Sequence, residues 1–140
     1  MKKAKTNAKN IVNRRARFDY ELGEELVAGM SLRGVEVRAV RDGRVSLKGA
    51  FVTLRNGRKG EELWLNNASF SLKNQGEGLS KADTIDTSPK KLLATRKQIQ
   101  NFATQKKAGL TIVPVKILAE ARFIKIVIAL GKGKKQYDKR

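Results

Sequence analysis

Three arginines stand within five residues near the N-terminus and are followed at once by two aromatic residues. The segment reads Asn13-Arg-Arg-Ala-Arg17, with Phe18 and Tyr20 after it. Arginine binds phosphate oxygens through parallel N–H groups and stacks on exposed bases, and tyrosine offers a further stacking face. The segment therefore indicates RNA binding. The alternatives are a solvated arm for the arginines and ordinary strand packing for Phe18 and Tyr20.

Catalytic chemistry has few suitable side chains in this sequence. The chain contains no cysteine and no histidine, which removes the thiol nucleophile, the commonest general base and the commonest metal ligand. The remaining catalytic hypothesis is a metal-dependent nuclease that uses carboxylates. Its candidates are Asp19, Glu21, Glu24 and Glu25, with Asp19 and Glu21 on one strand face. Such carboxylates are more often solvated or paired with arginines, so we expect no catalytic residue, no metal site and no cofactor.

The net charge of the chain indicates a polyanionic partner. The 140 residues include 31 Lys and Arg against 13 Asp and Glu, a formal net charge of +18. Repulsion among so many like charges opposes folding, and nucleic acid is the usual partner that offsets it. A membrane surface fits less well, because no segment combines a basic helical face with an apolar aromatic one. A generic basic protein is the other alternative.

Aromatic residues are too few for a single-strand stacking platform. The chain has five Phe, two Tyr and one Trp, and several of them must fill the core; we expect Trp64 to pack in a strand. This favours a structured RNA held through its backbone and shape. No run approaches the ~20 apolar residues of a membrane span, and no apolar segment follows the basic N-terminus as in a signal peptide. We therefore predict a cytoplasmic protein.

Turn signals and β-branched runs predict several short strands. The predicted elements are two strands around Gly23 in residues 18–32, a short helix over 33–42 ending at an Asp42-Gly43 turn, a strand over 45–54, a hairpin that turns at Asn56-Gly57 into Glu62–Asn66 with Lys59-Gly60 lengthening the loop, and a long central hairpin of 110–118 and 123–130. Val35 and Val37 would also suit a strand, which leaves the short helix open.

The clearest helix signal follows a polar loop at residues 73–88. Ser88 suits an N-cap, Pro89 the first helical position and Gly109 the stop, so we predict a helix from Pro89 to Ala108. The apolar stripe of this helix would be Leu92, Ile99, Phe102 and Ala103, and its cations Lys91, Arg96, Lys97, Lys106 and Lys107.

The predicted fold is mainly β with helices (α+β). Short strands, one long helix and one or two short helices suggest a small OB-like β-barrel, closed or partly open, and such barrels often bind nucleic acid. Residues 13–131 would form this barrel as a monomer. Residues 1–12 would be a disordered basic tail. Residues 132–140 form a basic segment that either fits a phosphate groove or stays disordered.

Five segments match one known family in order and spacing over about residues 12–140. They are Asn13-Arg-Arg-Ala-Arg-Phe-Asp-Tyr20; Ala28-Gly29 with Gly34-Val-Glu-Val-Arg38; Arg41-Asp-Gly-Arg-Val45; Lys90-Lys-Leu-Leu93; and Gly131-Lys-Gly-Lys-Lys-Gln-Tyr-Asp-Lys-Arg140. Together they resemble the small protein B family of SsrA-binding, or tmRNA-binding, proteins.

The resemblance implies an OB-like adapter of trans-translation that binds the tRNA-like domain of tmRNA. It would help to deliver tmRNA to stalled ribosomes for ribosome rescue and nascent-peptide tagging, in the decoding region of the small subunit. Elongation factor Tu and alanyl-tRNA synthetase would be indirect partners through tmRNA. Glu36 would accept hydrogen bonds from base or 2′-OH donors, or pair with Arg38 or Arg41. The predicted RNA-binding residues are Asn13, Arg14, Arg15, Arg17, Tyr20, Glu36, Arg38, Arg41, Arg44, Lys90, Lys91, Leu92, Lys132, Lys134, Lys135, Lys139 and Arg140.

Three features depart from the family pattern. Val27 stands where family members often have an acidic residue before Ala28-Gly29. The segment Asp86-Thr-Ser-Pro-Lys-Lys91 has one basic residue fewer than the Asp-Pro-x-Arg-x-Arg-Lys pattern usual in the family. Family members continue past the Asp-Lys-Arg triplet with a basic tail, whereas this sequence ends at Arg140. We expect this 140-residue form to bind tmRNA but to support tagging poorly, which a tagging assay on stalled ribosomes tests. A ribosomal or general OB-type RNA binder is the alternative function.

Overall fold

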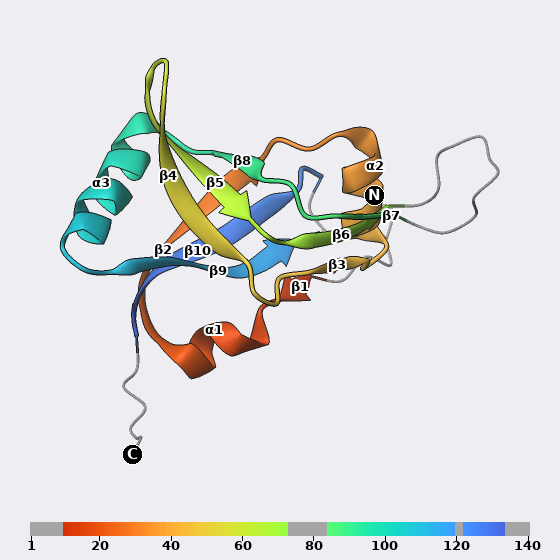
Figure 1. Cartoon of the computed structure of the whole chain (residues 1–140), viewed down its shortest axis with the longest axis horizontal. Coiled ribbons are helices and arrows are strands. Elements are labelled where there is room, and N and C mark those ends of the chain that lie inside the picture. Colours follow the sequence, from red (N-terminus) through yellow and green to blue (C-terminus); the bar gives the residue numbers. More distant parts are fainter. Residues whose placement is uncertain (1–9, 73–83, 120–121, 134–140) are drawn as a thin grey trace, which may run out of the picture.

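The largest element of the fold is one antiparallel sheet of seven strands. The computed structural model describes residues 10–72, 84–119 and 122–133. The strand order is β1-β9-β10-β2-β8-β5-β4, which can be followed in Figure 1. The strands of this sheet are β1 (Ile11–Val12), β2 (Tyr20–Met30), β4 (Phe51–Gly57), β5 (Gly60–Asn66), β8 (Lys90–Leu93), β9 (Thr111–Leu118) and β10 (Lys125–Gly133).

A sheet of three strands and three helices complete the described part. The smaller sheet is antiparallel in the order β3-β6-β7. Its strands are β3 (Val45–Ser46), β6 (Ser69–Leu72) and β7 (Thr84–Asp86), and the helices are α1 (Arg14–Asp19), α2 (Gly34–Arg41) and α3 (Arg96–Lys107). Figure 1 shows α3 and α2 at opposite ends of the molecule. The described part is therefore mainly β with helices, which confirms the predicted α+β class.

Apolar side chains from both sheets and from α3 meet in one core. Ile126 and Ile128 of β10 are fully buried, as are Phe70 of the smaller sheet and Phe102 of α3. Each such side chain contributes about 1.5–3 kcal/mol by leaving water. β9 and β10 pair antiparallel, which confirms the predicted long central hairpin.

The seven-stranded sheet has two free edges. β1 and β4 stand at its ends, and β4 approaches β9 without joining it in the strand order. Within the described residues we therefore find two antiparallel sheets, and the closed form of the predicted barrel is not observed.

The N-terminal part differs from the prediction in two ways. Residues 14–19 form α1 instead of leading into a strand, and Ile11–Val12 already pairs with β9, inside the segment that we assigned to the basic tail. β2 then runs without a break through Gly23, where we predicted two strands. Pairing with β10 along most of its length outweighs the low strand propensity of glycine.

The predicted helix from Pro89 to Ala108 is wrong in its first part. Lys90–Leu93 forms β8, which pairs with β2 on one side and β5 on the other. α3 begins only after Thr95, whose hydroxyl accepts from the backbone N–H of Gln98, while the Gln98 side chain accepts from the backbone N–H of Thr95. This reciprocal capping box fixes the start of the helix. Gly109, with φ 108°, follows the helix end as predicted.

The remaining local predictions are confirmed only in part, and Thr84–Asp86 of the predicted polar loop 73–88 forms β7. α2 and its Asp42-Gly43 turn lie where expected, and Trp64 stands in β5. The predicted strand over 45–54 is split into β3 and β4. The β4–β5 hairpin turns at Arg58-Lys59, between the paired residues Gly57 and Gly60, and not at Asn56-Gly57 as predicted. In the described ranges, none of the helices has the length and apolar character needed to cross a membrane.

Candidate nucleic-acid interface

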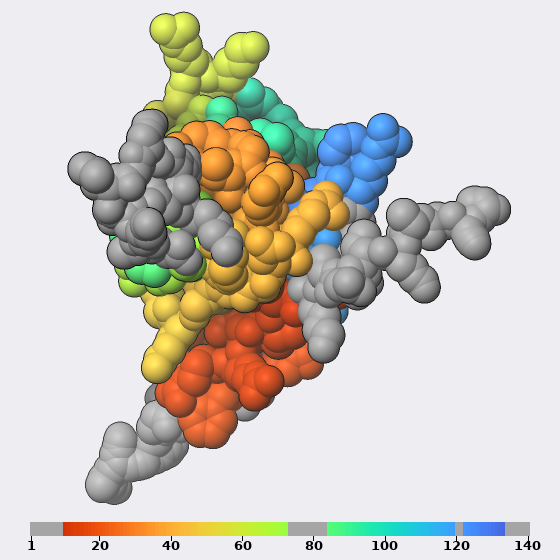
Figure 2. Space-filling view, turned by 90° about the vertical axis from the view of Figure 1, so that its right-hand side faces the viewer, coloured from red at the N-terminus to blue at the C-terminus, as the bar shows by residue number. Residues whose placement is uncertain are grey.

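Helix α1 borders an open groove that carries much of the predicted N-terminal cluster. The groove has a volume of about 530 Å³ and lies between α1, the β3–β4 connection, β4 and β9. Its polar and aromatic lining residues are Asn13, Arg15, Asp19, Tyr20, Lys48, Phe51 and Thr111. Lys48 and Phe51 were not predicted as site residues. Figure 2 shows the α1 segment, in red, protruding from the lower part of this face.

Asn13 holds α1 in place. Its side-chain amide donates to the carbonyl of Pro114 at 2.7 Å, and its backbone N–H donates to the carbonyl of Val115 at 2.8 Å. These bonds tie the start of α1 to β9. Asn13 therefore acts on the site by orienting the helix that carries the arginines.

The arginines of α1 are exposed, as RNA contact requires. Arg14, Arg15 and Arg17 all lie at the surface, while Tyr20 is half-buried. The Arg15 guanidinium lies 5.0 Å from the centre of the Phe18 ring and 3.3 Å from the Asp19 carboxylate. The Phe18 side chain is 64% exposed. α1 thus combines cations with a solvent-exposed aromatic ring, the combination that binds phosphate and base.

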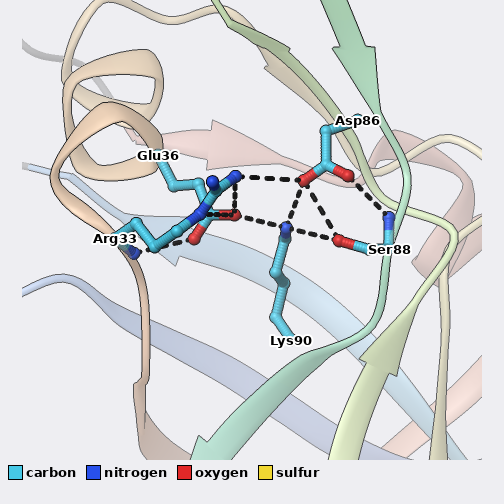
Figure 3. A network of polar contacts seen from close by, with 5 residues as sticks. All are labelled: Arg33, Glu36, Asp86, Ser88 and Lys90. Carbon is cyan, nitrogen blue, oxygen red and sulfur yellow. Dashed lines mark hydrogen bonds and ion pairs between the residues drawn. The ribbon is translucent and has the colours of Figure 1, made fainter.

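Lys90 lies at the centre of a buried polar network (Figure 3). Its ammonium group donates to the carboxylate of Glu36 at 2.6 Å, to that of Asp86 at 2.5 Å and to the hydroxyl of Ser88 at 3.0 Å. The same nitrogen lies 4.8 Å from the centre of the Phe70 ring. Arg33 completes the network, with its Nη2 3.1 Å from Glu36 and 3.9 Å from Asp86.

Both carboxylates in this network stay ionised in the fold. Burial alone raises the pKa of Asp86, but hydrogen bonds from Lys90 and Ser88 outweigh it and lower the pKa to about 2. Burial likewise raises the pKa of Glu36, and the bonds from Lys90 and Arg33 reverse this to a net lowering. The network therefore balances two carboxylates with two cations, the buried Lys90 and the exposed Arg33.

Three predicted RNA contacts are buried in this region. Lys90, Glu36 and Leu92 are 4%, 4% and 1% exposed, so they present almost no surface to a partner. The predicted pairing of Glu36 with Arg38 or Arg41 is replaced by pairing with Arg33 and Lys90. These residues shape the interface through the positions of α2, β7 and β8.

The arginines of α2 and of the turn after it differ in whether they bind backbone carbonyls within the protein. Arg38 is exposed. Arg41 donates to the carbonyls of Ala119 and Arg122, at 3.2 and 2.8 Å, and so fixes the two ends of the β9–β10 connection. Arg44 donates to the carbonyl of Ser71 and pairs with Asp42 at 3.0 Å. Arg41 and Arg44 therefore hold backbone in place.

The remaining predicted cations lie elsewhere on the surface. Lys91 pairs with Glu62 at 3.3 Å, and its side chain is 41% exposed. Lys132 is exposed on β10 opposite Glu21. Lys134, Lys135, Lys139 and Arg140 lie outside the described residues.

A second groove contains residues that the sequence did not single out. It has a volume of about 390 Å³, with Met30, Leu93 and Phe123 among its apolar residues and Arg41, Arg122 and Lys125 as its cations. Leu93 and Phe123 are 50% and 67% exposed, and the Arg122 guanidinium lies 5.4 Å from the centre of the Phe123 ring. The only sequence signal was a pair of cations, Arg122 and Lys125, on either side of Phe123 and Ile124, which is hard to distinguish from an ordinary strand start.

The carboxylates offer no arrangement for metal chemistry in the described ranges. Asp19 ends α1, whereas Glu21 stands in β2, so they do not share a strand face as we predicted. No three acidic side chains in these ranges come together in a way that could hold a metal ion.

The fold and these surfaces define a basic α+β protein with two grooves suited to nucleic acid. The model of the SmpB protein family matches residues 10–140. An SsrA-binding protein from Enterococcus hirae is 41% identical over 129 residues, which cover 91% of this chain and 79% of that protein. One from Prochlorococcus marinus is 40% identical over 141 residues, covering all of this chain and 82% of that protein.

The fold of this chain also resembles that of a chain in a solved structure. It is described as "tmRNA-SmpB: a journey to the center of the bacterial ribosome", and its chain superimposes with a TM-score of 0.68 at 34% identity. The match covers 95% of this chain and 90% of that chain. The chain belongs to the SmpB family, whose members are RNA-binding proteins and not enzymes.

Replacing Lys90 by methionine should destabilise the protein by about 3–5 kcal/mol at pH 7, because the buried Glu36 and the partly buried Asp86 then keep only the exposed Arg33 as a cation. Without Lys90 the pKa of each carboxyl rises, so this cost should shrink as the pH falls through about 4 and the carboxyls of the variant become protonated. Urea unfolding of wild type and variant at pH 7 and pH 4 measures both effects.

The matched control is Lys97→Met, at an exposed position on the first turn of α3, which should change stability by less than about 0.5 kcal/mol. Equal stability of the Lys90→Met variant and wild type at pH 7 would contradict the role assigned to the network.

Proposed function

We propose that this protein binds the tRNA-like domain of tmRNA and acts together with tmRNA on the ribosome in trans-translation. The observation that carries the proposal is the α1 surface, where three exposed arginines stand beside an exposed aromatic ring. Membership of the SmpB family, relatives named SsrA-binding protein and the related chain in a tmRNA–SmpB structure support the same assignment.

The wider assembly follows from this assignment. We propose the decoding region of the small subunit in a stalled ribosome as the place of action, which makes the protein cytoplasmic. Elongation factor Tu and alanyl-tRNA synthetase would then be indirect partners through tmRNA. The protein would act as a monomer, with residues 13–131 as a partly open OB-like barrel between a basic N-terminal tail and the basic segment 132–140.

The two grooves suit different parts of a structured RNA. The α1 groove presents Arg15 and Lys48 to phosphates, and Phe51 to a sugar or base. The Phe123 groove has an apolar interior with cations at its rim, a composition that suits an unpaired base and its flanking phosphates. An RNA with exposed loop bases therefore fits better than a plain duplex.

Arg17→Ala should weaken binding of the tRNA-like domain by about 1–2 kcal/mol, typical of a lost charge-assisted contact. Fluorescence anisotropy with a labelled tRNA-like fragment measures this change. Lys107→Ala, at an exposed position on the last turn of α3, is the charge-matched control and should bind like wild type. Wild-type affinity in the Arg17→Ala variant would mean that α1 is not the binding face.

Binding should also depend steeply on salt. With about 4–6 phosphate contacts, log K should fall with log salt at a slope of roughly −3 to −5. Titrations across a salt series give this slope, with an unrelated structured RNA of equal length as comparison. A flat salt dependence would refute a phosphate-dominated interface, and equal affinity for both RNAs would favour the general RNA binder over the tmRNA adapter.

A further inference from the structure

The β4–β5 hairpin projects from the sheet and ends in two cations. Its turn is Arg58-Lys59, between the paired residues Gly57 and Gly60, and both turn side chains are exposed. Figures 1 and 2 both show this tip at the end of the molecule opposite α1. Within the described residues, neither Arg58 nor Lys59 forms a salt bridge.

The hairpin is fastened to the start of α3. The Arg96 guanidinium donates to the carbonyl of Lys59. Gly60 allows this close approach, because its φ of 125° suits glycine and because a Cβ at this position would clash with the Arg96 side chain. The two cations at the turn are thus held on a fixed support.

Hairpin and helix enclose a groove of about 500 Å³ in which cations outnumber carboxylates. The charged lining consists of Arg58, Lys59, Lys91 and Arg96 against Glu61 and Glu62. Glu62 already accepts hydrogen bonds from Trp64 and Lys91, which lower the pKa of its carboxyl. The Glu62 carboxylate is therefore paired with Lys91. The other charged residues of the lining are three cations, Arg58, Lys59 and Arg96, and one carboxylate, Glu61.

Among the described residues, the lining of this groove includes cations and no aromatic ring. The nearby Trp64 is half-buried in β5, outside the groove lining. Cations without an exposed aromatic ring suit a base-paired RNA, which is recognised through its phosphates and 2′-hydroxyls.

We propose that this hairpin–helix groove is a second RNA site, which binds backbone phosphates of an RNA helix at the end of the protein opposite α1. It extends the proposed function, since it lets the protein hold two RNA segments at once. Of the cations that line this groove, only Lys91 is among the RNA-binding residues predicted from the sequence. Arg58, Lys59 and Arg96 are new assignments.

The test is binding of a labelled RNA duplex to the full chain preloaded with unlabelled tRNA-like RNA. The double variant Arg58→Gln/Lys59→Gln should weaken duplex binding about tenfold or more and reduce the salt slope by about 2, because two phosphate contacts are lost. Its affinity for the tRNA-like RNA alone should stay within about threefold of wild type, since long-range electrostatics are screened.

The matched control is Lys106→Gln/Lys107→Gln, which removes the same charge from the last turn of α3 and should leave the duplex slope unchanged. The inference fails if the hairpin variant binds duplex like wild type, if the control loses as much, or if preloading abolishes duplex binding. It also fails, while the proposed function stands, if wild type binds the tRNA-like RNA and no duplex. If wild type binds neither RNA, the proposed function fails too.

Discussion

One buried ammonium group joins parts of this structure that are far apart in the sequence. Lys90 stands in β8 of the larger sheet, Asp86 in β7 of the smaller sheet and Glu36 in α2, and all three meet within hydrogen-bond distance. A buried cation between two carboxylates is a demanding arrangement, because the loss of one member leaves an uncompensated charge in the interior. The network therefore fixes how the two sheets and α2 meet. On the same strand, Lys91 and Leu93 line the hairpin–helix groove, and Leu93 also lines the Phe123 groove.

The large positive charge serves two different purposes. Arg41, Arg44 and Arg96 each donate to backbone carbonyls of distant segments, so their guanidinium groups act as structural clamps. A guanidinium has five N–H donors, however, and these bonds use only some of them. A clamped arginine at a groove wall, such as Arg96, can thus fasten the wall and still offer donors to a phosphate. This explains why basic residue type alone does not separate structural from RNA-binding positions.

The sequence predicted those elements whose signals are local. The β9–β10 hairpin follows from two β-branched runs, and α2 from the spacing before Asp42-Gly43. The start of α3 was missed because Ser88-Pro89 has the features of a helix cap, whereas residues 90–93 gain more by pairing with β2 and β5. The same long-range pairing buries Lys90, which no local pattern reveals. The exposed cations of α1 were predicted, since repulsion among them and their lack of apolar periodicity keep them at the surface.

The chemistry of the three grooves differs in a way that separates their ligands. The α1 groove and the Phe123 groove each combine cations with an exposed aromatic ring, so each can bind a base together with its phosphate. The described lining of the hairpin–helix groove contains no aromatic ring, and its cations outnumber its carboxylates. Base contacts discriminate between RNA sequences, whereas phosphate contacts set position and orientation. Under the two proposals, RNA sequence specificity would lie on the faces beside α1 and Phe123, and the opposite hairpin would make a contact that any RNA helix could satisfy.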